Sequence, residues 1–313
     1  MKVILVGFWN EQVDELCKRF PNVEFRTTTK NMDGYQADAV ISGDRAAFDE
    51  IFKSGFLRRC ETLRWVHASG AGIETYCGPE LTSMPFTLTN EQIIQGPEVA
   101  DHGMALLLSL TRRIGHVLKG IPRDRMPRPV ELQGKHALII GSGGVGLAIA
   151  ERAAAFGMRV SVLTESNFPY LSFISERYLA GQLLEALPPA DVVFVAAPLT
   201  PITRKMIERS ALAVMKSSAY LINVTRGAII DTDELVQSLL RGHLSGVGLD
   251  VTDPEPLPSD HPLRTCERVI LTPHMAGMSD RLSERCFDLV ATNLRRFVDC
   301  RPLINVVNKE LGF

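Results

Sequence analysis

The chain has 313 residues, enough for two α/β domains that each bury a core of their own. With 45% hydrophobic and 22% charged residues and a formal net charge of -2, its composition is that of an ordinary globular protein and excludes a whole-molecule field that would attract nucleic acid or anionic membranes. The six cysteines form no C-x-x-C pair, and the longest apolar stretch, near 104–110, is far shorter than the roughly 20 residues that cross a bilayer. We expect no leader segment, no membrane and no nucleic-acid partner, and a protein of the reducing cytoplasm.

Strand-like apolar runs alternate with helix-like segments through the first domain. The runs lie at 2–7, 38–41 and 64–67, with weaker ones at 23–26 and 86–88. Together with a helical pattern from Glu11 to Phe20, this alternation predicts a parallel sheet covered by helices.

Pro97-Glu98 then opens a long helical pattern toward Gly115, which we interpret as a linker helix. Beyond it, six β runs alternate with helical segments and predict a full doubly wound sheet. These runs lie at 136–140, 159–163, 191–196, 219–224, 246–250 and 269–272. A last amphipathic helix, at about 280–298, leads into a β-like end at 304–307, which we expect to return to the first domain. The predicted domains are therefore 1–94 with 284–313, and 95–283.

A glycine-rich loop directly follows the run 136–140 and leads into a helical segment. The loop consists of Gly141-Ser142-Gly143-Gly144-Val145-Gly146. Gly141 permits a tight turn, Gly143 lets the backbone approach a pyrophosphate, and Gly146 lets the helix pack close to the strand. A glycine-rich turn in an empty domain is the alternative, but the strand, the helix and the later strands favour a dinucleotide site.

The end of the next strand bears on the choice of dinucleotide. An acidic residue there would hold the ribose 2′-hydroxyl of NAD, whereas an arginine would favour the 2′-phosphate of NADP. The sequence has Thr164, Glu165 and Ser166, with no basic residue beside them. Glu165 favours NAD, but the two hydroxyl side chains suit either cofactor, so both NAD and NADP stay open.

Arg226, Glu255 and His274 each stand just past one of the last three β runs. Ligands of open α/β sheets bind outside the carboxyl ends of the strands, so we expect these side chains to meet there. Each alone has an ordinary alternative: a surface ion pair, a solvated turn and a structural histidine. Together, behind a dinucleotide loop, they favour a catalytic set.

Such a set suits hydride exchange at a 2-keto acid. The carbonyl oxygen becomes an alkoxide as hydride arrives, and histidine is the side chain that gains and loses a proton near neutral pH. We assign His274 as the general acid/base and Glu255 as the carboxylate that fixes its tautomer. Arg226 is expected to hold the substrate oxygen and carboxylate through its planar fork of donors.

The chain resembles the D-isomer-specific 2-hydroxyacid dehydrogenases in several motifs besides the glycine loop. They are Pro198-Leu199-Thr200-Pro201-Ile202-Thr203, the segment 223–227, Gly248-Leu249-Asp250-Val251 with Glu255-Pro256-Leu257, and Thr272-Pro273-His274-Met275-Ala276-Gly277. In that family an Arg, a Glu and a His form the catalytic set, and they match Arg226, Glu255 and His274. The resemblance implies two doubly wound parallel-sheet domains, a Rossmann nucleotide-binding domain and a flavodoxin-like substrate domain.

The resemblance also implies further binding residues. Asp250 is expected to meet the nicotinamide carboxamide, and Ser69, Gly70 and Ala71 to offer amides to the substrate carboxylate, although a plain turn is the alternative there. Cofactor contacts beyond the glycine loop are expected from Thr164, Glu165, Pro198, Thr203, Thr225, Asp250, His274 and Ala276. Many NAD-using members carry Asp where this chain has Thr164, which again leaves the cofactor open.

We predict an enzyme that exchanges a hydride between NAD(P)H and a small 2-keto or D-2-hydroxy acid such as glyoxylate or hydroxypyruvate. No residues stand at metal-ligand spacing, so no metal is expected, and the resemblance implies a homodimer. Two alternatives stay open: a corepressor-like NAD(H) sensor on the same fold, and a formate or phosphite dehydrogenase. His67 is expected to be a pocket or structural residue, and Asp101 and His102 to pack within the linker helix.

Overall fold

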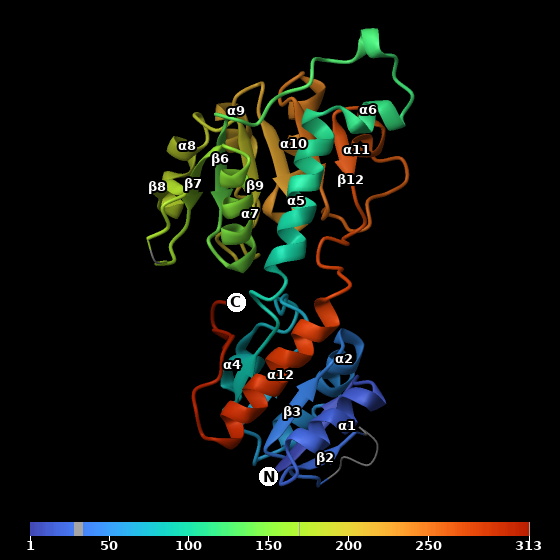
Figure 1. The fold of residues 1–313 in the computed structure, drawn as a ribbon, viewed down its shortest axis with the longest axis vertical. Helices are drawn as coiled ribbons and strands as arrows, with labels where there is room; N and C mark the ends of the chain where they lie inside the picture. Colours follow the sequence, from blue (N-terminus) through green and yellow to red (C-terminus); the bar gives the residue numbers. More distant parts are fainter. Residues whose placement is uncertain (28–33, 169, 313) are drawn as a thin grey trace. The chain divides into compact units, whose positions relative to one another are not determined.

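The structure is a computed structural model that describes residues 1–27, 34–168 and 170–312. The chain divides into two compact units: unit 1 comprises Met1–Ile94 and Asp280–Phe313, and unit 2 comprises Gln95–Ser279 (Figure 1). The chain crosses back into unit 1 at Asp280, slightly before residue 284, where we expected the crossing. Each unit is built on one parallel sheet with interleaved helices, which confirms the predicted α/β fold class.

Unit 1 contains a five-stranded parallel sheet in the order β2-β1-β3-β4-β5, which is the flavodoxin-like order. Its strands are β1 (Lys2–Val6), β2 (Glu24–Arg26), β3 (Ala39–Ser42), β4 (Trp65–His67) and β5 (Thr87–Thr89). Its helices are α1 (Asn10–Arg19), α2 (Arg45–Lys53), α3 (Phe56–Arg59), α4 (Pro79–Ser83) and α12 (Leu282–Val298). A single antiparallel bridge between Thr89 and Val306 joins the C-terminal segment to β5.

Side chains that alternate along the strands of unit 1 form a core on each face of its sheet. On one face, Val66 packs with the apolar residues of α2, α3 and α4. On the other face, Trp65 packs with Val290 and Leu294 of α12 and with Leu16 of α1. Unit 1 therefore needs the C-terminal helix to cover half of its sheet.

Unit 2 contains a seven-stranded parallel sheet in the order β12-β11-β10-β9-β6-β7-β8. Numbered from its own first strand, this is the Rossmann order with one strand added at an edge. The strands are β6 (His136–Ile140), β7 (Arg159–Leu163), β8 (Ile174–Tyr178), β9 (Val192–Val195), β10 (Tyr220–Asn223), β11 (Gly246–Leu249) and β12 (Val269–Leu271). The strand order reverses between β6 and β9, which places the ligand crevice of such a sheet beside the glycine loop.

Helices cover both faces of this sheet (Figure 1). Long helices α5 (Gly96–Thr111) and α7 (Gly144–Ala155) cover one face. The other face is covered by α8 (Leu183–Ala186), α9 (Arg209–Val214), α10 (Thr232–Leu240) and α11 (Pro262–Thr265). Short elements complete the unit: α6 (Ile114–Leu118) and the 3-10 turns η1 (Arg123–Arg125), η2 (Ala180–Gln182) and η3 (Gly227–Ile229).

Two details differ from the sequence prediction. The sheet of unit 2 has seven strands rather than six, because β8 pairs along the edge of β7. The linker helix does not run unbroken toward Gly115, since α5 ends at Thr111 and Arg113 adopts a left-handed conformation before α6. None of the helices in the described ranges is both long enough and apolar enough to cross a bilayer.

Candidate active site

The glycine loop between β6 and α7 is shaped by two close approaches of backbone to backbone. Gly141 has a φ of +104°, and a Cβ there would lie 2.6 Å from the carbonyl oxygen of Ala196. A Cβ on Gly146 would lie 2.0 Å from the carbonyl oxygen of Gly141. By contrast, a Cβ on Gly143 would have no described atom within 4 Å. The first two glycines therefore let the loop fold tightly, and the space over Gly143 stays open.

This open space lies at the amino end of α7, a helix of 12 residues. Gly143 is the N-cap and makes no side-chain cap hydrogen bond, so the first N–H groups of the helix have no partner from a capping side chain. Free N–H groups and the helix dipole together favour an anion. The residues present thus fit the pyrophosphate of a dinucleotide.

The predicted ribose position is lined by hydroxyl groups rather than by a free carboxylate. Thr164 is buried, and its Oγ1 lies 2.8 Å from Ser142 Oγ and accepts a hydrogen bond from the backbone N–H of Ser166 at 3.0 Å. Glu165 accepts the backbone N–H of Ala180 through Oε1 at 2.7 Å, which ties one of its oxygens to the η2 turn.

The loop after β10 carries Arg226 and packs against the loop after β11. The side-chain amide of Asn223 donates to the carbonyl of Arg226 at 2.9 Å, and Asn223 Oδ1 accepts the N–H of Thr225 at 3.1 Å. A Cβ on Gly227 would lie 2.0 Å from the carbonyl carbon of Thr252. Gly227 is therefore needed for these two loops to lie side by side. The Arg226 guanidinium donates to the carbonyl of Thr225 at 2.7 Å.

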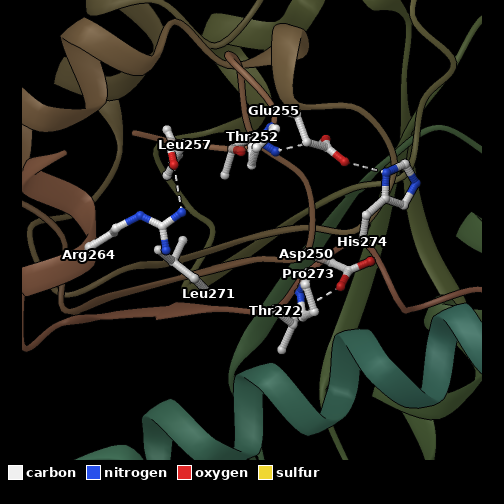
Figure 2. A pocket seen from close by; sticks show the side chains of 10 residues that line it. Asp250, Thr252, Glu255, Leu257, Arg264, Leu271, Thr272, Pro273 and His274 are labelled. Atoms are coloured by element: carbon white, nitrogen blue, oxygen red, sulfur yellow. Dashed lines mark hydrogen bonds and ion pairs between the residues drawn. The ribbon is translucent and has the colours of Figure 1, made fainter. Parts of the chain in front are cut away.

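The loops after β11 and β12 bring Glu255 and His274 together (Figure 2). His274 Nδ1 lies 2.6 Å from Glu255 Oε1, and the other carboxylate oxygen accepts the N–H of Thr252 at 3.4 Å. His274 has a φ of +50°, and its N–H donates to the carbonyl of Asp250 at 2.8 Å, so the backbone around it is held in an uncommon conformation. The side chains of His274 and Glu255 are 51% and 39% exposed, which leaves the imidazole accessible to a ligand.

Asp250 supports the segment that carries His274. Its carboxylate is fully buried and accepts the hydroxyl of Thr272 at 2.6 Å, the N–H of Met275 at 3.0 Å and the N–H of Ala276 at 2.8 Å. His102 of α5 joins them, with Nε2 2.8 Å from Thr272 Oγ1 and 3.3 Å from Asp250 Oδ1. The sequence pattern predicted only packing for His102 and gave no sign of this contact. No local sequence pattern shows that a histidine on a helix will contact residues at the end of a strand far away in the chain.

A cavity of about 410 Å³ lies beside the His274–Glu255 pair (Figure 2). Arg264 stands at its edge and donates to the carbonyls of Leu257 and Pro258, so that side chain holds the loop after Glu255. The cavity is lined by Asp250, Thr252, Glu255, Pro256, Leu257, Arg264, Leu271, Thr272, Pro273 and His274. Within the described residues, no group of three or more His, Cys, Asp or Glu side chains could hold a metal ion.

The remaining cofactor candidates lie in a turn after β9. Thr203 Oγ1 donates to the carbonyl of Pro198 at 2.6 Å and accepts the N–H of Thr200 at 2.8 Å. This turn follows the strand next to β6, on the side where the strand order reverses. Asp101, next to His102 in α5, forms an ion pair with Arg152 of α7 at 2.7 Å.

In unit 1, the loop Ser69-Gly70-Ala71 follows β4 and is tied to the end of β5. The N–H of Gly70 donates to Glu91 Oε2 at 2.6 Å, and Ser69 Oγ donates to Glu91 Oε1 at 3.3 Å. Asn90 Nδ2 donates to the carbonyl of Ala71 at 2.7 Å. The sequence does not single out Glu91, because a charged residue after a short strand is ordinarily solvated.

His67 is a core residue of unit 1. Its ring is fully buried, Nδ1 lies 2.9 Å from Thr89 Oγ1, and Trp65 Nε1 donates to the same hydroxyl at 2.9 Å. Burial lowers the pKa of His67 to about 4, because the charged imidazolium is poorly solvated there. The ring is therefore neutral at physiological pH.

A Rossmann sheet with an open glycine loop and a histidine–carboxylate pair at the carboxyl ends of its strands defines a dinucleotide-dependent oxidoreductase. Comparison with known proteins specifies the class. The family model for the "D-isomer specific 2-hydroxyacid dehydrogenase, NAD binding domain" matches residues 104–276, and the chain belongs to this family.

Relatives support the assignment along most of the chain. A glyoxylate reductase of Thermofilum pendens is 31% identical over 264 residues, covering 80% of this chain and 76% of the relative. A hydroxyphenylpyruvate reductase of Plectranthus scutellarioides is 33% identical over 303 residues, covering 94% of each chain. The crystal structure of a D-isomer specific 2-hydroxyacid dehydrogenase from Xanthobacter autotrophicus, in complex with NADPH and MES, has the same fold, with a TM-score of 0.81, 23% identity and 99% coverage of each chain. The protein is thus an NAD(P)-dependent oxidoreductase that acts on CH–OH donors.

Proposed function

We propose that the protein reduces a small 2-keto acid to the D-2-hydroxy acid, with His274, Glu255 and Arg226 as the catalytic residues. The observation that carries this proposal is the 2.6 Å contact between His274 Nδ1 and Glu255 Oε1 at the carboxyl edge of the glycine-loop sheet. A carboxylate at Nδ1 leaves Nε2 of the imidazole to exchange a proton with a ligand. A carbonyl reduction needs such a group beside the reacting oxygen.

The glycine loop and the amino end of α7 would hold the cofactor pyrophosphate, and the bound nicotinamide supplies the hydride. His274 Nε2 donates its proton to the carbonyl oxygen of the keto acid and takes it back in the reverse reaction. Glu255 keeps the Nδ1–H hydrogen bond throughout, which fixes the tautomer and balances the charge of the imidazolium. The hydrogen-bonded backbone around His274 holds the ring in place while the proton moves.

Arg226 is proposed to bind the carbonyl oxygen and carboxylate of the substrate, because a guanidinium stays charged and offers its donors in a planar fork. In unit 1, Ser69, Gly70 and Ala71 are proposed to bind the substrate carboxylate through their backbone. The remaining contacts of the cofactor are proposed for Thr164, Glu165, Pro198, Thr203, Thr225, Asp250 and Ala276.

Glyoxylate and hydroxypyruvate are the proposed substrates. Relatives named as glyoxylate reductase and hydroxypyruvate reductase support that choice and do not favour the sensor, formate and phosphite alternatives. We propose NAD or NADP as the cofactor, with Glu165 favouring NAD. A cytoplasmic homodimer formed through unit 2 is part of the same proposal.

The proposal is tested by steady-state oxidation of NADH and of NADPH with a panel of 2-keto acids, for the wild type and His274→Ala. We expect turnover in the wild type and a loss of about 10²-fold or more in kcat in the variant, the scale of general acid–base catalysis, with cofactor affinity largely kept. Glu267→Gln is a matched control, because Glu267 is exposed and stands at the opposite end of β12. Full turnover in His274→Ala would remove His274 from its role. Tight cofactor binding with no turnover of keto acids, formate or phosphite would instead support a sensor.

A further inference from the structure

The loop after β4 in unit 1 is held from three sides. Glu91 accepts the Gly70 N–H at 2.6 Å and returns a backbone hydrogen bond to the Gly70 carbonyl at 3.4 Å. Arg45 of α2 donates to the carbonyl of Gly72 and, at 3.0 Å, to Thr75 Oγ1. Asn90 Nδ2 donates to the carbonyl of Ala71, so the carbonyls of Gly70, Ala71 and Gly72 all accept hydrogen bonds. These bonds fix the shape of the loop before any ligand binds.

The N–H groups of Ala71 and Gly72 donate to no acceptor in the described parts of the chain. Successive backbone N–H groups in such a turn form a concave donor surface for an anion. The Gly70 N–H, by contrast, is already used by Glu91. Among the residues proposed above to bind the substrate carboxylate, Ala71 therefore offers an N–H and Gly72 adds a second, whereas the Gly70 N–H stays with Glu91. The bound carboxylate would lie one or two residues away from the Glu91 carboxyl group.

Glu91 is an unusual residue for that place, since it is only 4% exposed. Burial raises its pKa, and hydrogen bonds from the Gly70 backbone, Cys286 and Ser69 lower it by less. The charged or titratable groups on the surrounding elements are Arg45, Asp49, Glu50 and Lys53 on α2, His67 on β4, and Glu284, Arg285, Cys286, Asp288, Arg295 and Arg296 on α12. Of these, only Cys286 affects the Glu91 pKa, and the buried His67 ring is neutral at physiological pH.

We propose that Glu91 is the positioning residue of the substrate-carboxylate site in unit 1 and couples keto-acid binding to a proton. Protonated Glu91 still accepts the Gly70 N–H and so holds the loop in shape, whereas ionised Glu91 keeps the shape but repels the incoming carboxylate. Substrate affinity falls as pH rises through the range in which Glu91 ionises, above the ordinary carboxyl range. This inference rests on the proposed function for its ligand, a 2-keto carboxylate, and for the place of that carboxylate at the loop after β4.

The test measures binding rather than turnover. Oxamate, a non-reducible 2-keto-acid mimic, is titrated calorimetrically into the NADH-loaded wild type and into Glu91→Gln, at about pH 5 and about pH 8.5. Glutamine keeps an acceptor for the Gly70 N–H and removes the charge. We expect equal affinities at the lower pH and about tenfold tighter binding by Glu91→Gln at the higher pH, the order of magnitude for repulsion between two like charges that water partly screens. The two proteins differ only at residue 91, so the difference between their pH profiles isolates Glu91.

Two further variants complete the design. Glu91→Ala removes the charge and also the acceptor for Gly70 and Ser69, so oxamate should bind more weakly to it than to Glu91→Gln at both pH values. Glu61→Gln is the matched control, because Glu61 is an exposed residue at the amino end of β4, and it should follow the wild type. Parallel pH profiles for wild type and Glu91→Gln, or no oxamate binding to either, would overturn the inference. Keto-acid turnover alongside parallel profiles would overturn it while leaving the proposed function intact.

Discussion

Two glutamates of this protein make hydrogen bonds of the same length in opposite surroundings. Glu255 of unit 2 and Glu91 of unit 1 each hold a neighbouring group at 2.6 Å. The Glu255 side chain is 39% exposed and faces an imidazole that can carry a positive charge, whereas Glu91 is 4% exposed and faces an amide, a hydroxyl and a thiol. Access to water and the charge of the partner therefore decide the role of each carboxylate. A solvated carboxylate beside an imidazole can balance a positive charge, whereas a buried carboxylate beside neutral donors is harder to ionise.

The largest expected effect is on stability, and it differs between the loop that Glu255 contacts and the loop that Glu91 contacts. Gly227→Ala would place a methyl group 2.0 Å from the Thr252 carbonyl carbon, whereas at Gly70 the nearest described atom is Arg45 Nη1, at 3.8 Å. We expect Gly227→Ala to lower the free energy of unfolding by about 3 kcal/mol and to abolish turnover. Gly70→Ala, with a φ of +85° at this position, should cost only about 1 kcal/mol of backbone strain.

Denaturant unfolding followed by circular dichroism measures both losses. Equal losses in the two variants would contradict the close approach of the Arg226 and Thr252 loops.

The next effect tests the charge of Glu255. Glu255→Gln keeps an oxygen that can accept from His274 Nδ1 but removes the charge that balances the imidazolium. We expect kcat to fall by about thirtyfold, less than the roughly 10²-fold or more expected from loss of the general acid itself, because the hydrogen bond to Nδ1 is kept. Stability should change little, since the side chain is partly solvated. Steady-state kinetics with the best keto acid measures this loss, and Glu267→Gln serves as the control. A wild-type kcat in Glu255→Gln would mean that the hydrogen bond suffices without the charge.

The smallest effect concerns the contribution of Glu91 to stability. Its folded pKa is raised by burial, so the folded state holds the proton more tightly than the unfolded chain does. The contribution of Glu91 to the stability of the wild type is therefore fully present below the unfolded carboxyl pKa and is lost as pH rises toward the folded value. Glu91→Gln should match the wild type at acid pH and be more stable by roughly 1 kcal/mol near pH 8, a typical size for one substitution.

Thermal unfolding of both proteins across this pH range checks the sign. A variant less stable than the wild type at high pH would show that the Glu91 charge is well compensated in the fold.

Much of the architecture could be predicted from local patterns. Buried parallel strands appear as apolar runs, and a glycine loop between such a run and a helix is typical of a dinucleotide-binding domain. The contact of Glu255 with His274 could be expected, and Arg226 could be placed at the same edge of the sheet, because parallel strands end at one edge. The strand β8 was missed because its residues Ile-Ser-Glu-Arg-Tyr lie at the sheet edge and are mostly exposed, so they lack the apolar signal.

The features that could not be predicted from the sequence depend on contacts between distant segments of the chain. Glu91 is buried only because β5 pairs with β4 and α12 packs over them from the far end of the chain. His102 reaches Asp250 and Thr272 only because α5 lies across the sheet of unit 2. A single sequence shows each of these residues as an ordinary polar side chain, since burial and partners arise from tertiary packing.

The discontinuous make-up of unit 1 has a consequence for synthesis on the ribosome. The sheet face that bears Trp65 is covered by Val290 and Leu294 of α12, which emerge only after all of unit 2. Unit 2 is contiguous and can close its core first, while the nascent first segment of unit 1 carries an uncovered apolar surface for the whole time in between. The fold thus sets an order of maturation in which unit 2 can be complete before unit 1, and the early segment of unit 1 keeps an exposed apolar surface that favours aggregation until α12 is made.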